Sequence, residues 1–208
     1  LVDSGKIYID HIDVTRIPEH RRAKYLGRVF QDPMMGTAAT MGIDENLALA
    51  ARRGKFRSLM PGITAKEKAQ YKELLAELDL GLENRITSKV GLLSGGQRQA
   101  ITLLMASLKR PKLLLLDEHT AALDPKTAAK VLDTTEKIVQ KDNLTTIMIT
   151  HNMKDAIAHG NRLIMMNSGN IIFDISGEEK KKLTVEDLLE KFAIASGKEL
   201  DNDRMMLG

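Results

Sequence analysis

The stretch LLSGGQRQAITLLMASLKRPKLLLLDEHTAALD, residues 92–124, decides the fold. It begins with Ser-Gly-Gly-Gln at residues 94–97, a spacing typical of a capping box at a helix start. Four leucines within residues 112–116 then precede two adjacent carboxylates, Asp117 and Glu118. This order predicts a helix, then a strand buried on both faces, then an acidic strand end.

The helix start carries two glycines, Gly95 and Gly96, at positions where glycine weakens a helix. They are explained if another group must approach the backbone closely. Amides without side chains at a helix N-terminus suit a phosphate group. Ser94, Gly95, Gly96 and Gln97 are therefore candidate phosphate-binding residues, and the alternative is a helix cap without a ligand.

The acidic pair stands at the carboxyl end of the predicted strand, where open α/β sheets bind their ligands. Adjacent carboxylates repel each other unless a cation or a proton intervenes. Mg²⁺ prefers oxygen ligands, usually one or two carboxylates and phosphate. Asp117 is therefore a candidate metal ligand and Glu118 a candidate catalytic base, and the alternative is a solvated acidic turn.

These motifs together resemble a known family. Residues 93–97 (LSGGQ), 113–118 (LLLLDE) and 122–124 (ALD) are similar to the signature motif, Walker B strand and D-loop of ATP-binding cassette (ABC) ATPases. Such an ordered series is far less frequent by chance than any one motif. The resemblance implies an α/β fold: a P-loop NTPase core with a mostly parallel sheet and an inserted helical subdomain.

The resemblance also implies roles at three further positions. Gln31 matches the Q-loop glutamine, which reaches Mg²⁺ and water, and Asp124 matches the D-loop aspartate at the nucleotide interface. His151 matches the H-loop histidine, which contacts the γ-phosphate of ATP. Taken singly, these residues read as a loop glutamine, a helix N-cap and an exposed histidine, and their order along the chain favours the functional interpretation.

Composition limits the class of protein. With 31 basic and 28 acidic residues in 208, the charge is too balanced to indicate nucleic-acid binding. A hydrophobic content of 43% permits a sizeable core, and no apolar run approaches the roughly 18 residues of a membrane-spanning helix. The chain has no cysteine, so no disulfide framework is expected.

Periodicity and turn residues predict four segments. We expect the first part of the α/β core at residues 1–41, a helical subdomain at 42–92, the second part of the core at 93–177 and a C-terminal helical tail at 178–208. A β-branched run at residues 145–150 predicts a second buried strand.

The resemblance implies partners and a place of action. We expect a homodimer with two ATP molecules and Mg²⁺ at its interface, where residues 94–96 face the P-loop of the second copy. The dimer would dock on transmembrane permease subunits, and indirectly on a solute-binding protein, at the cytoplasmic face of the membrane. The sequence as a whole resembles bacterial importers proposed for aromatic amino acids, including tryptophan and tyrosine systems. His119 departs from the family pattern, which usually has proline at this position.

Two other classes of function remain as alternatives. A soluble ABC-type ATPase acting on DNA or ribosomes usually carries coiled-coil insertions or tandem cassettes, and neither is found in this sequence. An inactive interaction subunit is the second alternative. The presence of both Glu118 and His151 argues against it.

One family motif is missing. No G-x-x-x-x-G-K-[ST] sequence occurs in the 208 residues, and in the family this P-loop lies upstream of the position that matches Leu1. We expect a fragment or a truncated reading frame of a longer ATPase, and the rival expectation is a truncated subunit without activity.

We predict that the 208-residue chain alone binds Mg-ATP with a dissociation constant above about 100 μM. That constant corresponds to a binding free energy of roughly 5.5 kcal/mol. Each missing hydrogen bond from the P-loop to a phosphate forfeits about 1.5–3 kcal/mol, and the carboxylates of Asp117 and Glu118 repel phosphate. Calorimetric titration with Mg-ATP measures this affinity. Tighter binding would mean that the nucleotide sits elsewhere in the chain.

Overall fold

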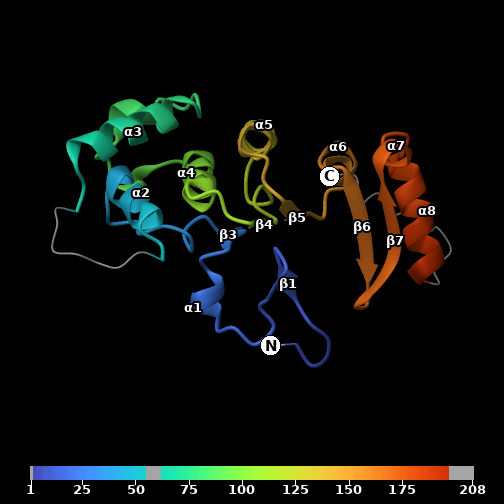
Figure 1. Cartoon of the computed structure of the whole chain (residues 1–208). Helices are drawn as coiled ribbons and strands as arrows, with labels where there is room; N and C mark the ends of the chain where they lie inside the picture. Colours follow the sequence, from blue (N-terminus) through green and yellow to red (C-terminus); the bar gives the residue numbers. More distant parts are fainter. Residues whose placement is uncertain (1, 55–61, 197–208) are drawn as a thin grey trace. The chain divides into compact units, whose positions relative to one another are not determined.

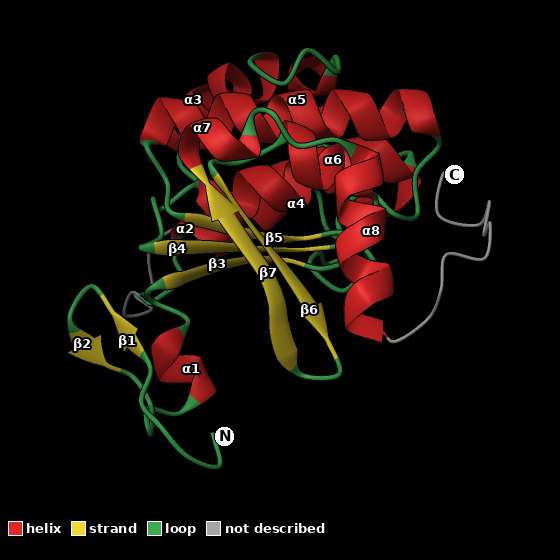
Figure 2. Ribbon diagram, turned by 90° about the vertical axis from the view of Figure 1, so that its right-hand side faces the viewer, coloured by secondary structure: helices red, strands yellow, loops and turns green. Residues whose placement is uncertain are grey.

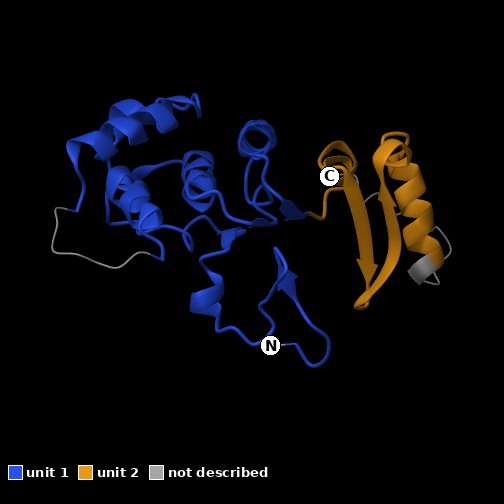
Figure 3. Ribbon diagram, viewed as in Figure 1, with its two compact units in different colours: residues 1–149 blue, residues 150–208 orange. Residues whose placement is uncertain are grey.

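The computed structural model describes residues 2–54 and 62–196 (Figure 1). The chain forms two compact units, Leu1–Ile149 and Thr150–Gly208 (Figure 3). None of the helices in the described ranges combines the length and apolar character that crossing a membrane requires. The end of the expected C-terminal tail, residues 197–208, lies outside these ranges.

The first unit alternates strands and helices along the chain. Its strands are β1 (Tyr8–Ile9), β2 (Ile12–Asp13), β3 (Leu26–Val29), β4 (Leu113–Asp117) and β5 (Thr146–Ile149). Its α-helices are α1 (Glu19–Arg22), α2 (Ile43–Ala51), α3 (Ala65–Ala76), α4 (Gly95–Ser107) and α5 (Pro125–Asp142). Two 3₁₀ helices, η1 (Leu82–Arg85) and η2 (Val90–Leu92), precede α4.

A three-stranded parallel sheet in the order β3-β4-β5 organises this unit, and β1 and β2 form a separate antiparallel pair. In the sheet Val29 lies opposite Leu116, and Leu116 lies opposite Met148. Helices α4 and α5 lie on the same side of the three strands (Figure 2). This arrangement follows from the chain order, because parallel neighbours need helical crossovers.

Helix α4 contributes to two hydrophobic cores. Leu103 and Ala106 pack with Val29, Leu114 and Leu116 against the sheet. The residues that pack instead against α2, α3 and the 3₁₀ helices are Ala100, Ile101 and Leu104. Full burial of a large aliphatic side chain stabilises the fold by about 1.5–3 kcal/mol, so α4 holds the sheet and the helical region together.

The expectation of strands buried on both faces is wrong for β4 and β5. Leu114 and Leu116 are buried, whereas the alternate leucines of β4 are only half-buried. In β5, Ile147 and Ile149 are each 52% exposed. Side chains alternate across a strand, and α4 and α5 both cover the same face, so alternate positions of the described sheet remain accessible.

Short-range hydrogen bonds shape the helical region. Thr64 caps α3, with the Thr64 hydroxyl accepting from the Glu67 amide at 3.2 Å and the Glu67 carboxylate accepting from the Thr64 amide at 2.8 Å. Asn46 of α2 is buried and accepts from the Ala38 amide at 2.8 Å. Its amide group also donates to the Gly42 carbonyl at 2.9 Å, which fixes the segment that follows Gln31.

The second unit contains α6 (Met153–Ala158), β6 (Arg162–Asn167), β7 (Asn170–Ser176), α7 (Gly177–Lys180) and α8 (Val185–Ser196). Strands β6 and β7 form an antiparallel hairpin. Its turn residues Ser168 and Gly169 have φ of 48° and 80°, the signs that a tight hairpin turn requires.

Lys180 of α7 is buried in this unit. Its ammonium donates to the carbonyls of Ile157 and of His159, the latter at 2.9 Å, beside the C-terminal end of α6. Burial lowers the pKa of the Lys180 ammonium. The contacts supply partners for carbonyls that the end of a helix leaves unpaired.

Candidate active site

The N-terminus of α4 is built as its sequence indicates. Ser94 is the N-cap: its hydroxyl accepts from the Gln97 amide at 3.3 Å, and the Gln97 side chain accepts from the Ser94 amide at 3.3 Å. Ser94 and Gly95 are exposed. This helix end therefore offers backbone amides and the positive end of the helix dipole to solvent.

Gly96 has a different explanation from the one the sequence suggests. A Cβ atom at Gly96 would lie 2.1 Å from Cγ2 of Thr127 on α5, which is far inside contact distance. A Cβ at Gly95 would lie 3.3 Å from the side chain of Leu123. The close packing of α4 on α5 thus requires glycine at residue 96 whether or not a ligand approaches, and no sequence signal identifies Thr127 as its neighbour.

Asp124 is the N-cap of α5, and its carboxylate accepts from the Thr127 amide at 3.0 Å. The hydrogen bonds from Thr127 lower the pKa of the Asp124 carboxyl group. Since Thr127 also contacts Gly96, the fold brings the helix start at residues 94–97 next to the loop that carries Asp124.

Asp117 ends β4 and contacts Arg28 of the neighbouring strand, with Nη2 of Arg28 3.5 Å from Oδ2 of Asp117. The Arg28 side chain is 48% exposed and the Asp117 side chain is 41% exposed. An ion pair of this length and exposure contributes little to stability. The Asp117 carboxylate therefore remains accessible to a cation.

Glu118 has an unusual backbone, with φ of 45°. Its amide donates to the Ile149 carbonyl at 3.0 Å, and its carbonyl accepts from the Ala121 amide at 3.0 Å. A non-glycine residue held in the left-handed region costs on the order of 1–3 kcal/mol, and such residues cluster at functional sites. The turn thus fixes the direction of Glu118 as it leaves the sheet.

Gln31 is exposed in the loop after β3, and the register of β3 with β4 places it at the same sheet edge as Asp117. The buried Gln99 of α4 donates to the Phe30 carbonyl at 3.3 Å, so the base of this loop is attached to α4. Gly36 of the same loop packs on α4 as well, since a Cβ there would lie 2.6 Å from Thr102. Sequence reasoning missed Gln99.

The described residues contain no cluster of three or more acidic or histidine side chains able to hold a metal ion. The Asp117 carboxylate and the Gln31 side-chain oxygen nevertheless have the hard-oxygen chemistry that suits Mg²⁺, an ion that keeps several waters and needs few protein ligands. Their position at neighbouring strand ends is compatible with that ion.

His151 lies in the second unit, where it is exposed and precedes Asn152, the N-cap of α6. All the other candidate residues belong to the first unit. The role of His151 in the site therefore stays a prediction.

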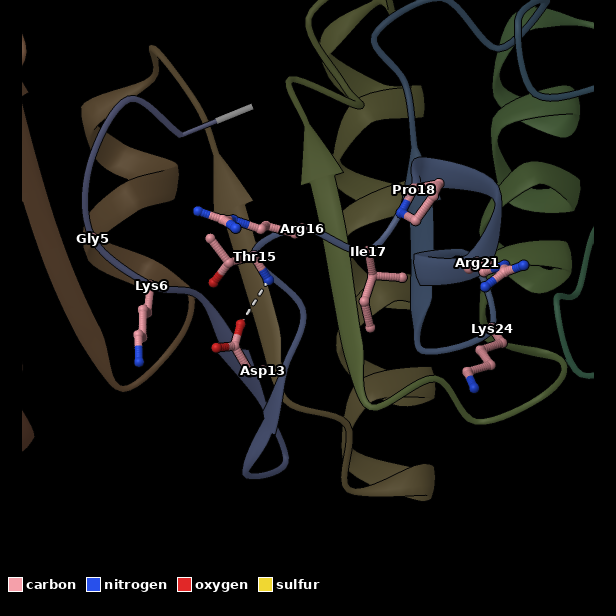
Figure 4. A pocket seen from close by; sticks show the side chains of 9 residues that line it. All are labelled: Gly5, Lys6, Asp13, Thr15, Arg16, Ile17, Pro18, Arg21 and Lys24. Carbon is pink, nitrogen blue, oxygen red and sulfur yellow. Dashed lines mark hydrogen bonds between the residues drawn. The ribbon is translucent and has the colours of Figure 1, made fainter.

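A cavity of about 730 Å³ in the first unit lies beside β2 and α1 (Figure 4). Its lining includes four basic side chains, Lys6, Arg16, Arg21 and Lys24, and the carboxylate of Asp13, which accepts from the Thr15 amide at 2.9 Å. None of the candidate nucleotide residues lines it.

Comparison with known sequences gives concordant matches. The family model described as ABC transporter matches residues 1–121. The chain is 47% identical over 192 residues to the tyrosine transport ATP-binding protein of Clostridioides difficile (strain R20291), covering 92% of this chain and 76% of that protein. It is 31% identical over 174 residues to the methionine import ATP-binding protein MetN of Bartonella henselae, covering 82% of this chain and 48% of MetN.

Comparison with solved structures agrees with the sequence matches. A dimeric ATP-binding cassette in a post-hydrolysis state with ADP and phosphate superimposes with a TM-score of 0.67 at 27% identity, covering 84% of this chain and 74% of that one. Another cassette, in its ADP conformation, gives 0.73 at 24% identity over 94% of this chain and 78% of that one. The α/β fold class predicted from the sequence is confirmed.

The contact between α4 and α5 yields a prediction. Gly96→Ala should destabilise the protein by about 1–3 kcal/mol, because the added methyl group meets a stiff β-branched side chain. The second substitution Thr127→Ser removes the obstructing Cγ2 atom and should restore most of the loss. Denaturant unfolding of the two single variants and the double variant measures this coupling, and equal effects of Gly96→Ala in both backgrounds would contradict it.

Proposed function

Since this chain belongs to the family of ATP-binding subunits of ABC transporters, whose members hydrolyse ATP, we propose that it energises amino-acid import with Glu118 polarising the attacking water. The observation that carries the proposal is the placement of Glu118. It directly follows β4, in a left-handed conformation, at the edge of the sheet that also carries Gln31. A carboxylate held in that direction can accept a proton from water as the water attacks.

Asp117 and Gln31 are the proposed Mg²⁺ ligands. When bound, the ion would neutralise phosphate charge, as it does in other P-loop enzymes. The chain's own contribution is to present two oxygen ligands from adjacent parallel strands. Arg28, which contacts Asp117 at 3.5 Å, would turn toward solvent or phosphate when the ion binds.

Ser94, Gly95, Gly96 and Gln97 are proposed to bind the nucleotide held by a second copy of the chain. The open helix end at Ser94 and Gly95 supports this, because exposed amides and the helix dipole attract phosphate. Dimers are described for a related cassette of 27% identity. Asp124, which lies beside this helix end through Thr127, would belong to the same interface.

His151 is proposed to contact the γ-phosphate. Its exposed position before the N-cap of α6 leaves the imidazole accessible. An imidazole N–H can donate a hydrogen bond to a phosphate oxygen.

The proposed partners are transmembrane permease subunits, with a solute-binding protein acting through them at the cytoplasmic face of the membrane. Three apolar side chains support a permease contact: Met34 and Met35, 46% and 71% exposed after the Q-loop, and Leu92, 72% exposed before α4. Methionine-rich surfaces adapt to partner helices. The tyrosine transport relative, at 47% identity, favours an aromatic amino acid as the cargo.

The test uses a completed cassette, defined as these 208 residues fused behind a P-loop segment from an ABC ATPase. Glu118→Gln should lower its ATP hydrolysis about 10²–10⁴-fold, the usual loss for a general base, while ATP binding is retained. The exposed Glu73→Gln on α3 is the matched control and should have no effect. Hydrolysis by Glu118→Gln within a few-fold of the parent would remove Glu118 from the proposed role.

A second prediction concerns assembly. In the completed cassette carrying Glu118→Gln, Ser94→Arg should abolish ATP-dependent dimerisation through bulk and charge, as measured by light scattering. Ser94→Ala is the control: it loses the cap, worth about 1 kcal/mol, but adds no obstacle and should still dimerise. An unchanged dimer of the Ser94→Arg variant would contradict a role for this helix end opposite a second copy.

A further inference from the structure

His119 follows Glu118 directly, at the position where the resemblance to ABC ATPases implies proline. Its side chain turns inward and is only 2% exposed. The ring nitrogen Nε2 lies 3.1 Å from the hydroxyl oxygen of Thr135, which is buried on α5. Burial of an imidazole without a hydrogen-bond partner is costly, so the contact with Thr135 is what makes the burial of His119 tolerable.

The neighbouring hydrogen bonds fix the direction of this contact. The Thr135 hydroxyl donates its single proton to the Val131 carbonyl at 2.8 Å. Toward His119 that oxygen can only accept, so Nε2 of His119 carries the proton and donates it. The pair is therefore a directed chain of two hydrogen bonds, from His119 through Thr135 to the backbone of α5.

The anchored segment carries the proposed catalytic group. Glu118 has φ of 45°, and its carbonyl accepts from Ala121 at 3.0 Å within the turn that follows β4. A proline after Glu118 would restrict this turn through its ring. Histidine imposes no such restriction, and its side chain is attached to α5 instead.

We propose that His119 is a positioning residue, whose hydrogen bond to Thr135 ties the turn that carries Glu118 to helix α5 and so fixes the direction of the Glu118 carboxylate. The proposal rests on the proposed function of Glu118. A small displacement of a group that must align with a reacting atom can cost far more in rate than in binding. The contact should therefore affect kcat and leave the KM for ATP almost unchanged.

Adjacent threonines of α5 provide a matched pair for the test. Thr134 and Thr135 are both buried, at 7% and 5% exposure, and each donates its hydroxyl proton to the carbonyl four residues earlier. Consecutive residues of a helix point about 100° apart, so Thr134→Val makes the same chemical change on a different side of α5.

In the completed cassette, Thr135→Val should lower kcat by about tenfold or more with less than a twofold change in KM, and Thr134→Val should leave both unchanged. His119→Ala should match Thr135→Val, and combining the two should add nothing further. His119→Gln, which keeps a donor at the end of the side chain, should recover most of the activity. Nitrogen–proton NMR correlations of His119 should show the Nε2–H tautomer in the parent and in Thr134→Val, and a changed pattern in Thr135→Val.

The outcomes separate this inference from the proposed function. Loss of hydrolysis in Glu118→Gln supports the role of Glu118. If Thr135→Val and Thr134→Val then reduce kcat equally, or neither reduces it, the positioning role of His119 is overturned while the role of Glu118 stands. If Glu118→Gln retains hydrolysis, both are overturned. Equal melting temperatures of the two valine variants exclude a stability difference as the cause of a selective loss in kcat.

Discussion

The structure of the first unit depends on the packing of α4 between two hydrophobic cores. Leu103 and Ala106 face the parallel sheet, and Ile101 and Leu104 face the helical region. The same helix begins at Ser94 and, through Gln99, holds the loop that contains Gln31. Groups proposed to meet different nucleotides are therefore parts of one rigid element, since packed interiors transmit displacement with little compression.

The second constraint is the close packing of α4 against α5. Because Gly96 lies against Thr127, the start of α4 cannot shift without displacing the start of α5, which Asp124 caps. Helix α5 in turn holds the turn after β4 through the contact of Thr135 with His119. The start of α4 and the turn after β4 are thus both held on α5 by short side-chain contacts.

Much of the fold could be predicted from the sequence, because its signals are local. The capping boxes at Ser94 and Thr64 each join residues three apart, and the motif order indicated the parallel sheet. Contacts between distant segments could not be predicted: nothing in the sequence pairs Gly96 with Thr127, and the positive φ of Glu118 depends on neighbours from β5 and within its own turn. The exposed isoleucines of β5 were missed because the sequence does not tell which faces of a sheet are covered.

The buried Lys180 affects the order in which the chain folds during synthesis on the ribosome. Helix α6 spans six residues, Met153–Ala158, and helices this short do not persist in water without tertiary support. The carbonyls of Ile157 and His159 beside its end accept hydrogen bonds from Lys180, which is synthesised more than twenty residues later. Helix α6, which begins two residues after His151, therefore gains these contacts only after synthesis has passed Lys180, and a nascent chain stalled before that point would lack them.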